Sequence, residues 1–210
     1  MTDSSQSLVQ RMRVPLGFVF GVLFLWLAPR FATPGKLAVG GTIALVGVLI
    51  RAWSTGHIVK NQKLTTTGPY AHTRNPLYLG SFLLALGFAF AAHWLAMVLV
   101  IAFWVAVYGP TIARERDYLR SVYGPDYAEY EASVPAFLPR LTAWKGPAGA
   151  DRSGGFSLPL YLRHNEWQAG LGFLVVLGWL VFSPFRGTAA NAGGIPDSVS
   201  PGVPSGLTPR

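Results

Sequence analysis

Five apolar segments, separated by short polar stretches, constrain the fold of this chain more than any other feature. Apolar residues make up 51% of its 210 residues and charged residues only 12%, whereas an average soluble domain has about 25% charged residues. A helix needs about 20 residues to cross a bilayer, with roughly 17 as the lower end. We therefore predict an all-α, multi-pass transmembrane helical bundle of about five spans, with short cytosolic amphipathic helices. The segments lie between Arg13 and Arg30, from Leu37 to Arg51, from Pro76 to His93, from Trp94 to Ile112, and from Trp167 to Phe185.

The second segment is the shortest, because Leu37 to Ile50 is only fourteen residues. We expect its helix to continue through Arg51 and Trp53 towards His57, which puts Arg51 about a turn inside the helix end. An arginine near the interface costs less than one at the bilayer centre and tends to face an interior site. We therefore predict that Arg51 faces a polar site and not lipid. The alternative is an arginine that simply snorkels to the interface.

The 17 Lys and Arg residues are unevenly distributed between the two sides of such a bundle. With the N-terminus in the cytoplasm, the outer segments hold only Arg30, Lys36, Arg186 and Arg210, and the inner ones hold the other thirteen. This bias favours an N-in, C-out arrangement. The first apolar segment has no small-residue cleavage site, so we expect a retained helix. The high usage of Ala, Gly and Arg favours a bacterial inner membrane, with any polar site on the cytoplasmic face.

Composition also excludes several classes of partner. The chain has no cysteine and its four histidines form no HExxH pair, so we expect no metal site. The formal net charge is +8, but the basic residues border apolar segments and form no stripe, so we expect no nucleic-acid partner. Residues 1–186 read as one membrane domain. Half of residues 187–210 are Gly, Pro or Ser, which predicts a disordered tail.

The polar segment GPYAHTRNPLYLG stands where the third apolar segment begins. Pro76 suits the first turn of a helix and Asn75 is a good N-cap, so we expect the helix to start here. Its exposed amides attract an anionic group, and Arg74 adds a fixed cation. The Gly68-Pro69 turn brings Tyr70 close, so the segment predicts a binding site at the membrane surface. The alternative is a capped helix with interfacial aromatics and a snorkelling arginine.

A second polar segment returns to the same face. His93-Trp94 joins the third and fourth apolar segments with almost no loop, which predicts a tight antiparallel hairpin. The sequence then becomes TIARERDYLRSVYGPDYAEYEASVPAFLPR, with a helical pattern that ends at Gly124-Pro125. Glu115 follows the membrane boundary directly in basic surroundings, so we predict a specific partner for it. The alternative is a solvated helix face.

These two segments resemble the isoprenylcysteine carboxyl methyltransferase family, whose wider group includes membrane phospholipid methyltransferases. The resemblance rests on GPYAHTRNPLYLG, the hairpin, and ERDYL-x3-YG-x2-Y-x2-Y-x3-VP, and it runs from about Arg51 to Arg140. It implies an integral membrane enzyme that binds S-adenosylmethionine from the cytosol. Two positions depart from the family pattern. Asn75 replaces the histidine of Arg-His-Pro and cannot carry a proton near neutral pH, and Arg116 replaces the second of two glutamates.

The resemblance and the residue chemistry together give a set of expected site residues. The acceptor is expected to be lipophilic or small, with a carboxylate, amine or thiol group, and to enter from the bilayer. The site residues are Arg74 and Glu115 as catalytic residues; Gly68, Pro69, Tyr70, Arg74, Asn75, Pro76, Tyr78 and Glu115 around S-adenosylmethionine; and Arg51, His57 and Lys60 on the acceptor side.

Two other functions stay open at this stage. A membrane NADPH-dependent sterol or enone reductase would share the C-terminal hairpin and polar region, but is expected to need a larger transmembrane portion and more cationic contacts. A non-catalytic membrane scaffold or small-molecule carrier would use the Asn75-Pro76 start only as a helix cap. A titration with S-adenosylhomocysteine and NADPH separates the three.

Overall fold

Helices form all the regular structure in the part of the chain described by the computed structural model, which confirms the all-α prediction. That part comprises residues 19, 21–57, 64–147 and 155–192, with side chains up to position 183. Lys60 and the ends of the chain lie outside it. After a helical turn at residues 21–27, the elements are η1 (Ala28–Arg30), α2 (Pro34–Thr55), η2 (Gly68–Ala71), α3 (Pro76–Ala92), α4 (Trp94–Phe103), η3 (Trp104–Tyr108), α5 (Gly109–Ser133), α6 (Leu158–Arg163) and α7 (Trp167–Ala192).

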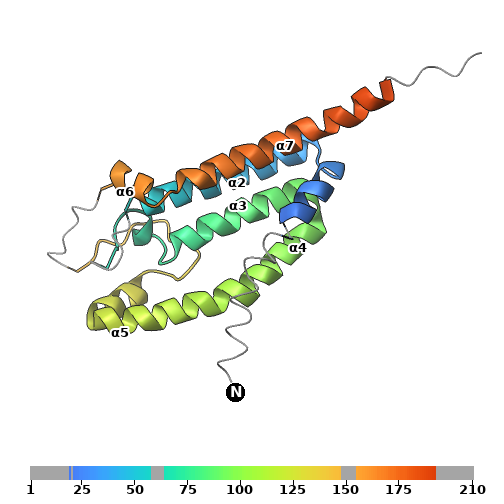
Figure 1. Ribbon diagram of the computed structural model, residues 1–210. Coiled ribbons are helices and arrows are strands. Elements are labelled where there is room, and N and C mark those ends of the chain that lie inside the picture. Colours follow the sequence, from blue (N-terminus) through green and yellow to red (C-terminus); the bar gives the residue numbers. More distant parts are fainter. Residues whose placement is uncertain (1–18, 20, 58–63, 148–154, 193–210) are drawn as a thin grey trace, which may run out of the picture.

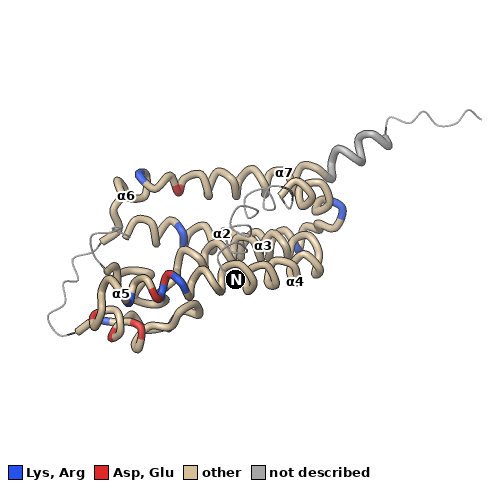
Figure 2. Tube along the Cα trace, turned by 60° about the horizontal axis from the view of Figure 1, so that its bottom comes forward, with Lys and Arg blue, Asp and Glu red and all other residues tan. Residues whose placement is uncertain are grey.

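Two helical stretches are long and apolar enough to cross a membrane by length and composition. They are α2 and the continuous stretch Trp94–Ser133, whereas Gly21–Arg30, Pro76–Ala92 and Trp167–Ser183 are apolar but shorter. Most charged residues gather at the end of the bundle that holds α5 and α6, and the middle of the helices carries few of them (Figure 2). This distribution suits membrane association, and the arrangement of five spans stays a prediction.

Helices α2 and α3 pack with their backbones unusually close. A Cβ atom added at Gly47 would lie 2.5 Å from the carbonyl oxygen of Gly80, and Gly40 meets Gly87 in the same way one heptad away. Ala44 lies fully buried between these two contacts. Only glycine permits such an approach, because any larger side chain would overlap backbone atoms.

Helix α7 completes this layer and lies along α2 (Figure 1). Its Leu180 is fully buried, and the rings of Phe88 on α3 and Phe173 on α7 are 5.8 Å apart. The helix runs to Ala192, so it includes residues 187–192, which the sequence analysis assigned to the tail. Residues 193–210 lie outside the described residues.

The path between α3 and α5 follows the predicted hairpin. His93 separates α3 from α4, and its Nδ1 accepts a hydrogen bond from the backbone N–H of Leu95. From Trp94 the chain continues through η3, a π-helical turn, into α5. Helix α5 lies on the side of α3 that is opposite α2 (Figure 1). The predicted break at Gly124-Pro125 is confirmed, because Gly124 has a φ of 51° and kinks α5 there. The kink turns the last part of α5 back towards η2.

Candidate active site at the start of helix α3

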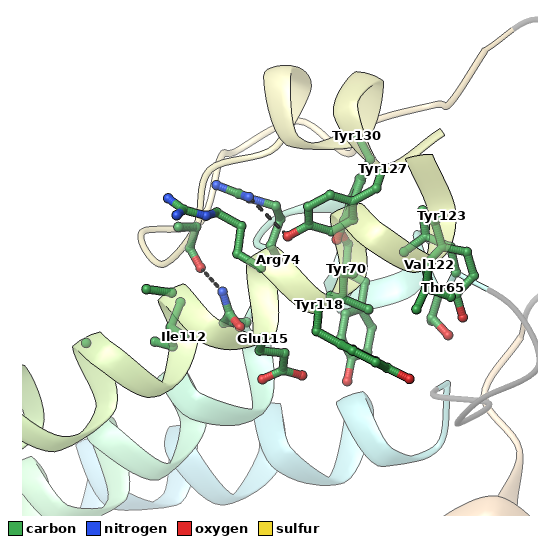
Figure 3. A pocket seen from close by; sticks show the side chains of 17 residues that line it. Thr65, Tyr70, Arg74, Ile112, Glu115, Tyr118, Val122, Tyr123, Tyr127 and Tyr130 are labelled. Atoms are coloured by element: carbon green, nitrogen blue, oxygen red, sulfur yellow. Dashed lines mark hydrogen bonds between the residues drawn. The ribbon is translucent and has the colours of Figure 1, made fainter. Parts of the chain in front are cut away.

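A cavity of about 480 Å³ lies between η2, the start of α3, and α5. It is within the roughly 300–1,000 Å³ range typical of small-molecule sites. Figure 3 shows that its walls carry both charged and tyrosine side chains. Four predicted cofactor residues line it: Tyr70, Arg74, Asn75 and Glu115. The structure therefore brings the two predicted polar segments together around one space.

A return segment, residues 134–144, fixes the loop between η2 and α3 by backbone hydrogen bonds. The N–H of Arg74 donates to the carbonyl of Pro135, at 2.9 Å. Further along, Arg140 donates to the carbonyl of His72 and Trp144 to that of Ala71, each at 2.9 Å. These bonds satisfy backbone groups that a free loop would leave to water, so the loop is held as firmly as a regular element.

Arg74 is held by acidic and phenolic partners from α5. Its Nη1 donates to Glu131 at 2.6 Å and to the Tyr127 hydroxyl at 3.3 Å. The other oxygen of Glu131 accepts a 2.6 Å bond from Nε of Arg120. Burial disfavours the charged form of Glu131, but the bonds from Arg74 and Arg120 outweigh it and lower the pKa of this carboxyl. Glu131 was not predicted as a site residue. The sequence predicts a break at Gly124-Pro125, but it does not indicate the direction in which the helix turns after the break.

One nitrogen of the Arg74 guanidinium makes no hydrogen bond to the described residues. Its Nε is buried and has no hydrogen-bond partner among the described residues, although burying an unpaired donor costs about 1–3 kcal/mol. The Nε and Nη2 edge of a guanidinium matches a carboxylate in a two-point contact. Arg74 therefore brings a cation to the cavity wall while its Nη1 holds Glu131, and its buried Nε reaches an anionic group only if neighbouring side chains move.

Glu115 contributes to the cavity wall from an exposed position on α5. Within the described residues it makes no ion pair, so its carboxylate stays available to a cationic or hydroxyl group. Its neighbour Arg116 also lines the cavity but pairs with Asp117 at 2.8 Å. The cavity wall thus presents both a cation and an anion.

Tyrosines form much of the remaining wall. Tyr70 and Tyr130 are buried, and the Tyr130 hydroxyl donates a 2.7 Å bond to the carbonyl of Tyr70. Burial is the main reason that the pKa of each phenol is raised, so both stay neutral over the physiological range. Tyr127 and Tyr130 were not predicted as wall residues. Their three-residue spacing on one helix face was the available signal.

Asn75 does not cap α3 with its side chain, which corrects the prediction. The helix does begin at Pro76, but no side-chain cap bond is present. The Asn75 Nδ2 instead donates to the carbonyl of Ala136 at 2.8 Å. The return segment brings a backbone acceptor to the amide, and that contact takes the place of the local cap.

The other predicted cofactor residues support the site without lining the cavity. Gly68 has a φ of 59°, and an added Cβ there would lie 2.5 Å from the His57 ring. Pro69 and Pro76 are buried in the loop and the first helical turn. The ring of Tyr78 lies 5.5 Å from that of Tyr108 in η3.

Of the predicted acceptor-side residues, Arg51 lies near the end of α2 and His57 just after it. Helix α2 continues through Arg51 as expected, and the Arg51 guanidinium pairs with Glu166 at 2.7 Å and also bonds Ser81 on α3. The Nδ1 of His57 lies 2.9 Å from the carbonyl of Trp53. Neither Arg51 nor His57 lines the cavity, and Lys60 lies outside the described residues. Among those residues, no group of three or more His, Asp or Glu side chains could hold a metal ion.

Comparison with known proteins agrees with this arrangement. A family model described as phospholipid methyltransferase matches residues 44–126, which include most of the cavity wall. The predicted family resemblance is confirmed. The chain is also 28% identical over 128 residues to a protein-S-isoprenylcysteine O-methyltransferase from Schizosaccharomyces pombe, covering 58% of this chain and 54% of that protein.

Two bacterial relatives carry a different description. A cobalt-zinc-cadmium resistance protein, CzcN, from Cupriavidus metallidurans is 37% identical over 123 residues, which is 58% of this chain and 55% of the relative. A nickel-cobalt-cadmium resistance protein, NccN, from Alcaligenes xylosoxydans xylosoxydans is 33% identical over 122 residues, or 57% and 55% of the two chains. The chain thus spans about half the length of the curated relatives it matches. No solved structure matches it.

Proposed function

We propose that this chain is an integral membrane methyltransferase that uses S-adenosylmethionine and methylates a lipophilic or small acceptor at a carboxylate, amine or thiol. The observation that carries the proposal is the cavity between η2, α3 and α5. It lies largely in the segment that matches the family and has both Arg74 and Glu115 in its wall.

The donor set fits the charged groups of this cofactor. The Arg74 guanidinium in the cavity wall suits the cofactor carboxylate. Glu115 suits the ammonium or the ribose hydroxyls, because an ionised carboxylate accepts from both. Tyr70 bounds the less polar parts as a neutral ring. The start of α3 adds a positive dipole end beside Arg74.

The chemistry asks the protein mainly for alignment. S-adenosylmethionine supplies a methyl group on a sulfonium, which the acceptor lone pair takes by in-line displacement, leaving S-adenosylhomocysteine and the methylated acceptor. A carboxylate or thiolate acceptor needs no general base, and an amine loses its proton to solvent. Holding both partners in line can contribute about 7–11 kcal/mol. The fixed loop 68–75 and the wall of α5 serve this alignment.

We place the cavity at the cytoplasmic face of a bacterial inner membrane. The Lys and Arg bias supports that orientation. Helix α5, which forms part of the cavity wall, lies at the end of the bundle where charged residues gather (Figure 2). A water-soluble cofactor then enters from the cytosol while a lipophilic acceptor arrives laterally. The metal-resistance names of two relatives do not extend the proposal to metal binding, because no described cluster of ligands supports it.

Binding measurements test the cofactor. The purified chain in detergent is titrated calorimetrically with S-adenosylhomocysteine and with NADPH. We expect saturable binding of the first and none of the second. Binding of NADPH alone would favour the reductase alternative, and binding of neither would favour a scaffold or carrier.

Product analysis tests the transfer and identifies the acceptor. The chain is incubated with methyl-labelled S-adenosylmethionine and vesicles of a total bacterial lipid extract, and the products are separated. We expect a labelled lipid-soluble product. Release of the label as methanol in mild base marks a methyl ester, and a base-stable product marks N- or S-methylation. Small thiols and fatty acids form parallel arms, and absence of label in every arm refutes the proposal.

A further inference from the structure

A charged pair outside the cavity wall joins three parts of the chain. Arg51 comes from α2, Ser81 from α3, and Glu166 from the turn before α7. Both oxygens of Glu166 accept from Arg51, at distances of 2.7, 2.8 and 3.1 Å. The side chains of Arg51 and Glu166 are only 21% and 12% exposed. Glu166 lies outside residues 44–126, so the family match assigns it no role.

The turn that carries Glu166 has an unusual backbone. Asn165 has a φ of 55° and is the only described residue other than glycine in the left-handed region. Asn165 directly follows the C-cap of α6, where a left-handed residue such as Asn commonly ends a helix. The preceding His164 has a buried Nδ1 without a partner among the described residues. This helix end directs Glu166 inward onto Arg51, and not outward to water.

The return of the chain before α6 holds this turn in place. The N–H of Ser157 donates to the carbonyl of Gly56, at 2.8 Å, at the end of α2. The Phe156 ring packs directly on Gly56, leaving no room there for a side chain. The turn at Glu166 is therefore attached to the same helix end as Arg51.

The pair is close enough to the cavity to affect it. Tyr70 lines the cavity, and its pKa is raised first by burial, then by the charge of Glu115, then by that of Glu166. The end of α2 packs against η2, because a Cβ atom added at Gly68 would lie 2.5 Å from the His57 ring. Ser81, which Arg51 contacts, is six residues after Asn75 of the cavity wall, or about 9 Å along α3.

Arg51 has hydrogen-bonding capacity to spare. A guanidinium has five N–H donors, and the bonds to Glu166 and Ser81 use Nε and at least one donor on each of the other two nitrogens. Up to two donors remain. An ionisable residue at the membrane end of a helix is a functional candidate when its geometry is fixed in this way.

We propose that Glu166 is a positioning residue for the methyl acceptor: it holds the Arg51 guanidinium between α2 and α3, where that cation receives an anionic oxygen of a lipophilic acceptor. The oxygen belongs to a carboxylate or to a phosphate headgroup. This inference rests on the proposed function.

Three variants separate positioning from simple stabilisation. Glu166→Gln keeps an oxygen for the guanidinium but removes the charge. Glu166→Ala removes the contact. The double variant Arg51→Glu with Glu166→Arg keeps an ion pair but moves the cation from α2 to the turn before α7. Glu129→Gln is the matched control, because it removes one acidic charge at an exposed position that does not line the cavity.

Each variant is assayed with labelled S-adenosylmethionine and vesicles of the same total lipid extract, alongside S-adenosylhomocysteine affinity and thermal unfolding. Both single Glu166 variants should raise the half-saturating lipid concentration or lower the maximal rate by about tenfold or more, because small misplacement of a reactant is costly. Cofactor affinity should not change. The double variant should recover thermal stability without recovering lipid methylation. Mild-base release of the label distinguishes a carboxylate acceptor from a headgroup methylated elsewhere.

Recovery of both stability and methylation in the double variant would overturn the inference, because the pair would then serve only the fold. Unchanged lipid dependence in folded Glu166→Gln would overturn it as well. A parallel loss of cofactor affinity would assign Glu166 to the cofactor side and refute the acceptor role. If the unaltered chain labels no lipid but methylates a small acceptor, the inference fails while the proposed function stands. Absence of label in every arm refutes both.

Discussion

The Nη1 of Arg74 lies 2.6 Å from a carboxylate oxygen of Glu131, although fifty-seven positions separate the two residues in the chain. The contact crosses from the loop before α3 to the part of α5 beyond the kink at Gly124. It closes the loop against α5 and sets the orientation of the Arg74 guanidinium. Several properties of the candidate site depend on this pair.

Acidification should release the contact between Arg74 and Glu131. The pKa of Glu131 is lowered in the folded chain, so its ionised form contributes stability that is fully present above its ordinary value of 4.5 and is lost as the pH falls through the lowered value. The midpoint of thermal unfolding in detergent should therefore drop over this acidic range. Glu131→Gln should flatten the drop and be less stable at neutral pH.

Asp117→Asn is the control for this experiment, because its ion pair with Arg116 is largely exposed and such pairs contribute little. Its unfolding profile should follow that of the unaltered chain. An equal flattening in Asp117→Asn and Glu131→Gln would show that the acid sensitivity is a general charge effect.

Glu115→Gln should weaken cofactor binding without unfolding the chain. Glu115 lines the cavity from an exposed position on α5, so its removal disturbs no packed contact. Loss of one charge-assisted bond costs about 1.5 kcal/mol or more, which is roughly tenfold in Kd. Calorimetric titration with S-adenosylhomocysteine measures it. Glu129→Gln, exposed on the same helix and away from the cavity, should bind like the unaltered chain, and equal affinity in all three proteins would remove Glu115 from the site.

Asn75 offers a test between two structural roles. If its amide acts by donating to Ala136, Asn75→Ala should lose about 0.5–1.5 kcal/mol of stability. Asn75→Asp should lose more, because a carboxylate cannot donate and faces a carbonyl oxygen. A capping role predicts the opposite order, since Asp and Asn cap about equally well. Thermal unfolding of the two variants distinguishes the two roles. If Asn75→Asp unfolds at the same temperature as the unaltered chain, the capping role is restored.

Local residue chemistry was sufficient to predict some of the helix boundaries, although α6 was not predicted and α7 ends later than expected. The extension of α2 through Arg51, the start of α3 at Pro76, and the break at Gly124 follow from segment length, proline placement and a glycine-proline pair. These signals act within a few residues, so one sequence is enough to read them. The turn at His93 follows in the same way.

Contacts between distant segments could not be predicted from one sequence. Glu131 and Glu166 look like ordinary surface acids until the kink of α5 and the turn before α7 direct them to Arg74 and Arg51. The side chain of Asn75 was assigned to the local cap because the competing carbonyl of Ala136 comes from sixty-one positions away. Both errors have one cause, which is that a local preference was overruled by a tertiary partner.

The close approach of α2 and α3 gives the last prediction. Gly47→Ala should destabilise the chain, because the added methyl would meet the Gly80 carbonyl oxygen and the backbone of Leu84. Overpacking of this kind costs about 1–3 kcal/mol. Gly170→Ala is the matched control, since nothing lies within 4 Å of a Cβ atom at that position of α7. Thermal unfolding in detergent should show a lower midpoint for Gly47→Ala and an equal or higher midpoint for Gly170→Ala, because alanine favours helix over glycine. If both variants unfold like the unaltered chain, α2 and α3 are not packed through Gly47, and the position of Arg51 beside Ser81 on the next turns of the same helices would have to be reconsidered.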